Sequence, residues 1–481
     1  MDTVPVLLEK RASDELFASV AGETRTFREA SGIAASLAGA LYERGVRKGD
    51  RVATMLPNCI EHVDLIFACA RLGAIHVPVN VFLKGDFLRY QLDDSSPSVV
   101  VADAAGLKAL DEIGRKGVEV RTLGGGTPPP IDVGPGDTMA IIYTSGTTGM
   151  PKGCMLPYGY HIPKDNTLLE YAKGDVLYTA LPLFHGWARG MLFAALVYGL
   201  TIHIDAEFSA TKALKRIKET KATVFTGVGA MGMAMLAQPV SDEDQDNELR
   251  VAFMIPFSAE AEANFTKRFG PRVQSQMYGQ TETGAITFTP LNAAGKPGTI
   301  GKAAPTYDVK LDEGEVIVKA KYSDFLYSGY WGKPPLEGSW HHTGDLAGLD
   351  GDGYFVFLDR MKDALRRRGE NVSSVQLEAA ITAHPDITEA AVVAVASELS
   401  EDEIKACVVC AKHVEPDELF AFFRDKLPYF AIPRYVEIVD ALPKTVTMRV
   451  QKHVLRDAGV TEATWDFERL GLTVARDERR S

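Results

Sequence analysis

Cysteine is scarce in this chain, with five residues among 481, and long apolar runs are missing. An odd, sparse set of cysteines predicts reduced thiols and a cytoplasmic setting rather than a disulfide scaffold. The longest apolar stretch, near residues 191–204, is too short to span a bilayer. The first residues lack the apolar core of a secretory signal peptide, so we expect neither a membrane span nor export.

An excess of basic residues is also missing. Lysine and arginine total 52 against 64 acidic residues, a formal charge of −12. This balance argues against a nucleic-acid partner, although loops and helix N-termini can still bind phosphate ligands. With 46% hydrophobic and 24% charged residues the chain has the composition of a globular protein, long enough for two unequal domains or three units.

Helix-like and strand-like segments alternate along the first part of the chain. A helical pattern over residues 27–45 is followed by a strand-like RVATMLP, a helix-like HVDLIFACARLG and a strand-like AIHVPVN. This alternation predicts an α/β architecture with mostly parallel sheets. A fresh α/β pattern begins after GDLAGLDGDGYFVFLDR, which predicts one domain over residues 1–361 and a second over 362–481.

A loop rich in glycine and hydroxyl side chains follows a buried strand in MAIIYTSGTTGMPKG, residues 139–153. Glycines let the backbone approach an anion, and hydroxyl and N–H groups donate hydrogen bonds to it. The spacing is not that of a Walker loop. The candidate phosphate ligands are Thr144, Ser145, Gly146, Thr147, Thr148 and Lys152. A polar hairpin turn is the alternative.

This loop resembles the signature loop of the adenylate-forming (ANL) superfamily, which includes acyl-CoA synthetases, peptide-synthetase adenylation domains and luciferases. Further segments resemble the family's motifs in the family's order: PLFHGWARG, MYGQTETG, HHTGD, LDRMKDALRRRGENVSSVQLE and LPYFAIPRYVEIVDALPKTVTMRVQK. The RRRGENVSS form resembles the acyl-CoA ligase branch. The resemblance implies a large N-terminal domain of several subdomains and a small, mobile C-terminal α+β domain.

The resemblance also implies a reaction in two halves. ATP and a carboxylic acid, with Mg²⁺, give an acyl-adenylate, and CoA then displaces AMP to give a thioester. In the family's pattern Tyr278 flanks the adenine, Thr281 contacts phosphate and Glu282 holds magnesium, as a hard oxygen ligand. Asp345 accepts the ribose hydroxyls, and Arg360 assists. A buried salt bridge for Glu282 and an acidic turn for Asp345 are the structural alternatives.

The acyl and CoA sites follow from the same resemblance. His185 lines the acyl site near the thioester chemistry, although a lone histidine is often structural. The expected lining of the acyl pocket is Trp187, Gly227, Gly229 and Met231. Core packing is the alternative for Trp187, and tight helix packing is the alternative for the glycines and methionines. The expected hinge is Lys362, and the expected CoA contacts are Arg366, Arg368 and Gly369.

One departure from the family bears on the chemistry. The closing motif is usually PKTxxGK, whereas this chain reads PKTVTMRVQK, which places Arg449 at the position of the adenylation lysine. Arginine keeps the charge but not the compact shape. We therefore expect adenylation to be impaired, so that the protein converts an acyl-adenylate made by a separate adenylating enzyme. Arg449 could instead suffice, or Lys444 or Lys452 could reach the site.

A second departure is MIPFS at residues 254–258, where the family has a glycine-rich stretch. The bulk of Met254 and Phe257 is expected to disturb ordinary ATP placement. Three other functions compete with the split reaction: an ordinary two-step synthetase, an enzyme that loads a carrier protein, and a catalytically inactive nucleotide-binding relative.

Overall fold

The fold is described from a computed structural model. It describes residues 2–475 apart from 145–149, 164–165, 256, 323, 335–339, 361–363, 368–369, 397–401 and 444–449. The chain divides into two compact units. The larger comprises Met1–Val81, Leu92–Ile142 and Gly153–Asp359, and the smaller Phe82–Gln91, Tyr143–Lys152 and Arg360–Ser481. The predicted boundary at residues 361 and 362 falls on undescribed residues and stays a prediction.

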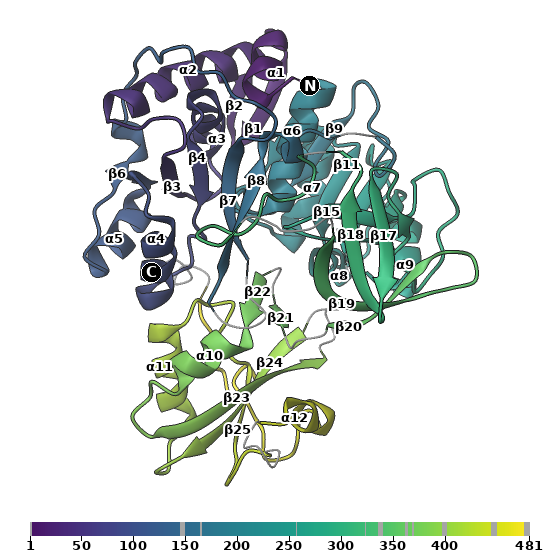
Figure 1. The fold of residues 1–481 in the computed structure, drawn as a ribbon. Helices are drawn as coiled ribbons and strands as arrows, with labels where there is room; N and C mark the ends of the chain where they lie inside the picture. Colours follow the sequence, from purple (N-terminus) through teal and green to yellow (C-terminus); the bar gives the residue numbers. More distant parts are fainter. Residues whose placement is uncertain are drawn as a thin grey trace. The chain divides into compact units, whose positions relative to one another are not determined.

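The first sheet has six strands in the order β6-β5-β3-β4-β7-β8 (Figure 1). The strands are β3 (Arg51–Met55), β4 (Ile75–Pro78), β5 (Val99–Ala102), β6 (Val118–Glu119), β7 (Thr138–Thr144) and β8 (Lys152–Pro157). The pairs β6·β5, β5·β3, β3·β4 and β4·β7 are parallel. The accompanying helices are α2 (Phe27–Glu43), α3 (Ile60–Leu72), α4 (Gly85–Ser95) and α5 (Ala104–Glu112), and the short helices are η1 (Val120–Thr122) and η2 (Tyr158–His161).

Local sequence explains where these helices begin and end. Thr26 and Glu29 form a capping box that starts α2. Gly73, with φ +68°, ends α3 in the left-handed conformation that favours glycine. The alternation predicted over residues 27–80 is therefore confirmed.

The second sheet has seven strands in the order β13-β12-β11-β9-β10-β1-β2, all parallel except the antiparallel pair β1·β2. The strands are β1 (Leu16–Val20), β2 (Glu23–Thr26), β9 (Val176–Thr179), β10 (Thr201–Ile204), β11 (Val224–Val228), β12 (Val251–Ile255) and β13 (Arg272–Gln274). The helices are α1 (Val4–Lys10), α6 (Gly186–Tyr198), α7 (Ala210–Thr220), α8 (Gly229–Leu236) and α9 (Ala259–Phe269).

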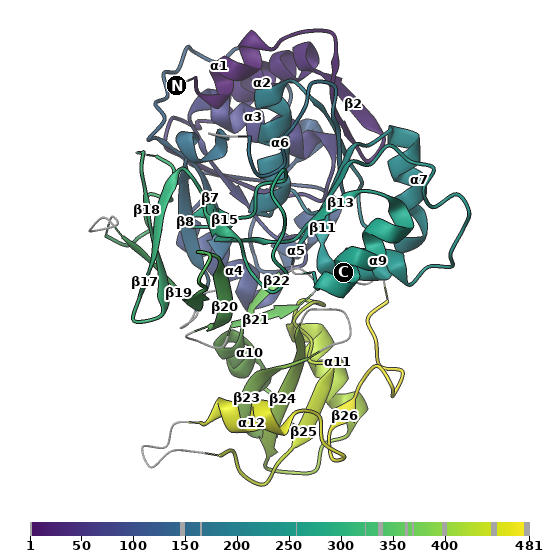
Figure 2. The same cartoon turned by 90° about the vertical axis from the view of Figure 1, so that its right-hand side faces the viewer.

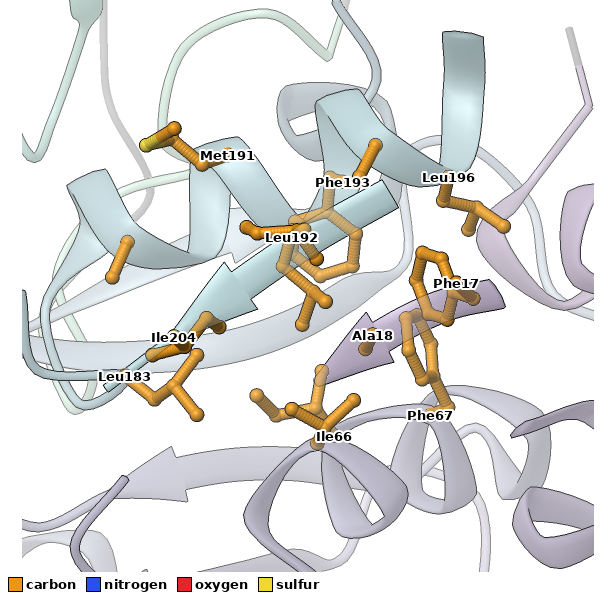
Figure 3. Close-up of a cluster of buried hydrophobic side chains, with 14 of the residues drawn as sticks. Phe17, Ala18, Ile66, Phe67, Leu183, Met191, Leu192, Phe193, Leu196 and Ile204 are labelled. Atoms are coloured by element: carbon orange, nitrogen blue, oxygen red, sulfur yellow. The ribbon is translucent and has the colours of Figure 1, made fainter. Parts of the chain in front are cut away.

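Apolar side chains fill the layers on both sides of this sheet. Figure 3 shows Phe193 and other residues of α6 meeting Phe17 of β1, Ile204 of β10 and Phe67 of α3 in one buried cluster. On the other side, α7, α8 and α9 (Figure 2) pack through Ile217 and similar residues on the strands β9, β11 and β12. Helix α6 is thus fixed along its length by the core.

Strand β12 corrects one expectation. Successive side chains of a strand point to opposite faces, so Phe253 and Met254 face different layers. Met254 and Phe257 are buried with the residues of α8 and α9, and a Cβ on Gly232 of α8 would lie 2.3 Å from the Met254 sulfur. The bulk at Met254 and Phe257 therefore fills the helix layer, and Gly232 serves tight packing. The bulk of Met254 and Phe257 therefore gives no reason to expect disturbed ATP placement.

Antiparallel strands complete the larger unit. One sheet has the order β14-β15-β16, with β14 (Met277–Gln280), β15 (Gly284–Phe288) and β16 (Lys302–Ala303). The other has the order β17-β18-β19-β20, with β17 (Tyr307–Asp312), β18 (Glu315–Ala320), β19 (His341–Leu349) and β20 (Phe355–Arg360).

The smaller unit contains a mixed four-stranded sheet, β23-β24-β25-β26, and a two-stranded ribbon, β21-β22. The strands are β21 (Ala364–Arg367), β22 (Glu370–Ser373), β23 (Ile387–Ala396), β24 (Asp402–Cys410), β25 (Tyr435–Ile438) and β26 (Trp465–Asp466). Helices α10 (Ser374–Ile381) and α11 (Pro416–Lys426) pack on one face of the sheet, and α12 (Lys452–Ala458) packs on the other (Figure 1). The predicted large α/β part and small α+β part are confirmed.

The five cysteines are free thiols. Cys407 of β24 packs toward α12, and burial raises its pKa to about 11. None of the helices described here is long and apolar enough to cross a bilayer.

Helix α9 gives a prediction about stability. Burial raises the pKa of Glu262 from 4.5 to about 7, and Arg272 only partly offsets this. Between these pH values the folded state holds the proton that the unfolded chain has lost, so the free energy of unfolding falls as pH rises. Glu262→Gln is expected to reduce this decline between pH 5 and 8, measured by urea unfolding. Glu260→Gln, at an exposed site on the same helix, is the control and should leave the pH dependence unchanged.

Candidate functional site

The hairpin between β14 and β15 carries one of the candidate acids. Gln280 pairs with Gly284, and the Gln280 N–H donates to Thr283 Oγ1 over 3.0 Å. Gly284 has φ +67°, and a Cβ on Gly279 would lie 1.9 Å from the Gly284 carbonyl oxygen. Glycine is therefore required at both positions, and the tight turn that results presents Glu282.

Asp345 on β19 is the second acid, and among the contacts of its side chain are hydrogen bonds from a phenol and from an amide. The residue is 3% exposed. The Tyr278 hydroxyl donates to Asp345 Oδ2 over 2.6 Å, and Gln280 Nε2 donates to the same oxygen over 2.8 Å. Gln280 Nε2 also donates to the Thr343 carbonyl at 2.8 Å. These hydrogen bonds orient the carboxylate, as recognition of a diol requires.

Glu282 is held in a similar way. It is 8% exposed, and the Tyr330 hydroxyl donates to its Oε1 over 2.8 Å. Burial, and then the charge of Glu282, raise the pKa of Tyr330, so the phenol keeps its proton at neutral pH. The Tyr327 N–H donates to the Glu282 carbonyl at 2.9 Å. A carboxylate oriented by a phenol fits a hard cation such as magnesium.

His341 links Gln280, which donates to Asp345, to Tyr327. Its Nε2 lies 3.4 Å from Gln280 Oε1, which can only accept, so Nε2 carries the proton. Its Nδ1 then accepts from the Tyr327 hydroxyl at 3.1 Å. Burial lowers the pKa of His341 to about 4, so the imidazole is neutral at physiological pH. His341 therefore positions the Gln280 amide beside Asp345 as a neutral group.

Four members of this network were not predicted from the sequence: Gln280, Tyr327, Tyr330 and His341. Gln280 and His341 do stand inside the motifs YGQTETG and HHTGD, which is the signal that could have marked them. The two tyrosines stand in none of the motifs.

The remaining nucleotide ligands are only partly described. Thr144 ends β7, Lys152 begins β8, and Thr281 lies in the turn after β14. Arg360 ends β20, but its side chain is outside the description. The loop residues outside the described part of the chain are Ser145, Gly146, Thr147 and Thr148. The phosphate-binding role of this loop stays a prediction.

The loop that leads to His185 is fixed by a buried asparagine. Asn58 is 5% exposed, and its Nδ2 donates to the Leu181 carbonyl at 3.0 Å while its Oδ1 accepts from the Leu183 N–H at 2.8 Å. His185 itself donates its N–H to the Pro182 carbonyl at 3.0 Å and forms the N-cap of α6. The backbone of His185 therefore has a fixed position at the start of the helix, and its imidazole is half-buried there.

Trp187 stacks on Phe253 of β12, with ring centroids 4.5 Å apart and planes inclined by 15°. Its indole N–H is buried and has no hydrogen-bond partner among the described residues. Met231 belongs to the cluster against which Trp187 packs, and a Cβ on Gly227 would lie 3.1 Å from the Met231 sulfur. Gly229 begins α8. Trp187 thus offers an apolar face and an unused donor, and the acyl-pocket role of these residues stays a prediction.

The CoA contacts and the hinge fall mostly outside the description. Lys362, Arg368 and Gly369 are not described, and neither is the side chain of Arg366 on β21. Arg367, between the two predicted CoA contacts, is 3% exposed and pairs with Glu403 at 2.7 Å. The middle arginine of the run therefore stabilises the smaller unit.

Lys452 is engaged within the smaller unit. Its Nζ lies 2.6 Å from Glu378 Oε1 and 2.8 Å from Ser374 Oγ, which joins α12 to α10. Both contacts would have to break before Lys452 could act elsewhere. Arg449 and Lys444 lie outside the described residues.

No group of three or more histidine, cysteine, aspartate or glutamate side chains in the described part of the chain is placed to hold a metal. A magnesium ion does not require such a group, because it binds through one or two carboxylates, substrate phosphates and waters. Glu282 therefore fits as a ligand for magnesium that arrives with a nucleotide.

Comparisons with known proteins identify the family of the chain. Residues 8–331 match the family model described as AMP-binding enzyme, and residues 376–449 match its C-terminal domain. A feruloyl-CoA synthase of Amycolatopsis is 32% identical over 90% of this chain and 94% of its own length. The 2-succinylbenzoate–CoA ligase of Geobacillus kaustophilus is 31% identical over 95% of this chain and 98% of its own.

A solved structure covers nearly the whole chain as well. The o-succinylbenzoate CoA synthetase of Bacillus subtilis, bound to a product analogue, matches with a TM-score of 0.84 and 26% identity over 94% of this chain and 98% of that chain. The same synthetase in complex with ATP and magnesium matches with a TM-score of 0.68. The chain therefore belongs to the AMP-binding enzyme family, in the acyl-CoA synthetase branch of the adenylate-forming superfamily.

Proposed function

We propose that the protein is an acyl-CoA ligase, which forms the CoA thioester of a carboxylic acid through an acyl-adenylate. The observation that carries this proposal is the pair of buried acids, Asp345 and Glu282, oriented by Tyr278, Gln280 and Tyr330. In the full reaction the carboxylate oxygen attacks the α-phosphorus of ATP and pyrophosphate leaves. The CoA sulfur then attacks the acyl carbonyl carbon, and AMP leaves.

Each acid has a separate role in this proposal. Asp345 accepts hydrogen bonds from the ribose hydroxyls, which fixes the α-phosphate relative to the acyl group. Glu282 binds magnesium, which when present neutralises charge on the phosphate oxygens. The loop from Thr144 to Lys152 donates hydrogen bonds to phosphate, and His185, fixed at the start of α6, lines the acyl site. Arg366, Arg368 and Gly369 contact CoA.

The finer proposal is that the first half-reaction is impaired. Arg449 replaces the lysine that bridges the carboxylate and the α-phosphate, and loss of such a contact typically costs about 10²–10³-fold in rate. The ion pair of Lys452 with Glu378 supports this proposal, because it commits the nearest alternative lysine to the packing of α12. The protein would then act on a preformed acyl-adenylate supplied by a separate adenylating enzyme.

The experiment compares two routes to the thioester. Purified protein receives a panel of hydrophobic acids with ATP, magnesium and CoA, and in parallel the synthetic acyl-adenylates with CoA, and the thioester is measured by mass spectrometry. Thioester from the adenylates alone supports the split reaction. Equal turnover by both routes would show an ordinary two-step synthetase. This is the second candidate function, and the presence of both Asp345 and Glu282 favours it. Nucleotide and CoA binding without thioester by either route would contradict both.

For the acyl group we propose an aromatic acid with a hydrogen-bond acceptor on its ring or chain. The face of Trp187 suits a planar group, and its buried indole N–H needs an acceptor. The relatives named for feruloyl and 2-succinylbenzoate groups support this class.

Trp187→Phe tests this choice, because phenylalanine keeps a ring against Phe253 and removes only the N–H donor. Since a neutral hydrogen bond contributes about 0.5–1.5 kcal/mol, kcat/KM for an acceptor-bearing aromatic adenylate is expected to fall about 3–10-fold. The adenylate of the same acid without the acceptor is the control substrate, and its kcat/KM should change little. Equal losses for the two substrates would contradict the hydrogen bond.

A further inference from the structure

The larger unit encloses an arginine in its core. Arg189 on α6 is 0% exposed. Its Nη1 donates to His76 Nδ1 over 2.7 Å, whereas its Nε and Nη2 have no hydrogen-bond partner among the described residues. Burial lowers its pKa only to about 10, so the guanidinium remains charged at neutral pH. A buried charge without a counter-charge is strongly destabilising, so something should compensate it.

The histidines on one side of Arg189 do not provide that compensation. Because Arg189 donates to His76 Nδ1, the His76 proton is on Nε2 and is donated to Thr54 Oγ1, 2.8 Å away. Thr54 then donates to His62 Nε2 at 3.3 Å, and the His62 Nδ1–H donates to the Pro57 carbonyl at 3.2 Å. Each hydrogen bond points away from Arg189, and burial keeps both imidazoles neutral by lowering their pKa values. These hydrogen bonds satisfy the polar atoms of His76, Thr54 and His62, but the positive charge of Arg189 remains without a counter-charge.

A second buried side chain, that of His161, also has a nitrogen without a hydrogen-bond partner among the described residues. His161, in η2, is 6% exposed, and its Nε2 is buried without a hydrogen-bond partner among the described residues. Its ring centroid is 4.7 Å from that of Phe193, and the Arg189 guanidinium carbon lies 5.8 Å from the same phenylalanine ring. Both side chains therefore pack against the same ring of α6, and together they carry three nitrogens without a hydrogen-bond partner among the described residues.

We propose that Arg189 and His161 bind a small monovalent anion, with chloride as the occupant, inside the larger unit. Chloride accepts N–H donors and cancels the single positive charge, whereas a water molecule satisfies donors and leaves the charge. With the His161 proton on Nε2, three donor nitrogens in apolar surroundings that include Cys69 and Phe193 are too few for a phosphate dianion. The anion stabilises the helix that presents His185 and Trp187, and this site does not depend on the proposed reaction.

The test measures the thermal unfolding of the full chain in sodium chloride and in sodium gluconate at equal ionic strength and pH. A ligand that binds only the folded state raises Tm with its concentration, so Tm is expected to be higher in chloride by about 2 °C or more and, above the Kd, to rise with the logarithm of the chloride concentration. In crystals soaked in bromide, an anomalous peak is expected within hydrogen-bond distance of Arg189 Nη2 and His161 Nε2.

Variants separate this site from general salt effects. Arg189→Gln should abolish the difference between chloride and gluconate. His161→Phe, which keeps the ring against Phe193, should raise several-fold the chloride concentration above which Tm begins to rise. Arg268→Gln is the matched control, because Arg268 is already paired with Asp244 at 2.7 Å, and it should keep the difference. Equal Tm in the two salts, water in place of bromide beside Arg189, or a chloride effect that persists in Arg189→Gln would each overturn the proposal. The wild-type titration and the bromide crystal decide the question even if Arg189→Gln does not fold.

Discussion

Replacing Asp345 with asparagine is expected to lower kcat/KM for an acyl-adenylate by about 10–100-fold, with a parallel loss of AMP affinity. The carboxylate offers two acceptors to two ribose hydroxyls, and a hydrogen bond to a charged group is worth about 1.5–3 kcal/mol. Asparagine keeps the size of the side chain but replaces one acceptor with a donor. Because the adenylate is the substrate in this assay, the result does not depend on how well the first half-reaction works.

The surroundings of Asp345 sharpen the experiment. Tyr278→Phe removes one of the two donors that orient the carboxylate while the charge stays, so a smaller loss of about 3–10-fold is expected. Asp352→Asn is the control, because this carboxylate pairs with Lys296 and its side chain is 71% exposed. AMP affinity is measured by calorimetry and folding by the unfolding midpoint. Wild-type affinity in Asp345→Asn would show that ribose is bound elsewhere.

Local sequence was sufficient where the determinants of structure are local. The predicted helix that begins at residue 27 starts at the capping box of Thr26 and Glu29. The predicted helix in HVDLIFACARLG ends at Gly73, which is left-handed. The antiparallel sheet β17-β18-β19-β20 was not predicted, because its register depends on pairing between segments far apart, such as Val318 with His341. Periodicity indicates that a strand exists, but it does not indicate its partner.

The candidate site shows the same division. Motifs indicated Asp345 and Glu282, but not the residues that orient them, because Tyr330 reaches Glu282 across 48 positions of the chain and belongs to no motif. Side-chain direction was the other gap. The segment MIPFS suggested bulk near the nucleotide, whereas Met254 faces the helix layer. Only the packing of β12 between two layers decides which of its alternating side chains face each layer.

The second large effect concerns Arg449. Arg449→Lys is expected to raise the rate of acyl-adenylate formation from acid and ATP by about 10²-fold or more, because a compact ammonium replaces a planar fork at the junction of two anions. Pyrophosphate release measures this half-reaction without CoA. Formation of the thioester from a synthetic adenylate should change little, since that half-reaction does not use the bridging cation. An equal change in both half-reactions would instead indicate a general effect on folding or on nucleotide binding.

Two further lysines make this test specific. Lys452→Met breaks the contacts with Glu378 and Ser374, so the unfolding midpoint of the smaller unit should fall while pyrophosphate release from the Arg449→Lys protein persists. Lys444→Met in the same background should also leave pyrophosphate release intact if position 449 carries the bridging charge. If instead wild-type protein releases pyrophosphate as fast as Arg449→Lys, a guanidinium is adequate at this position. The charge alone would then matter, and the separate adenylating enzyme would be unnecessary.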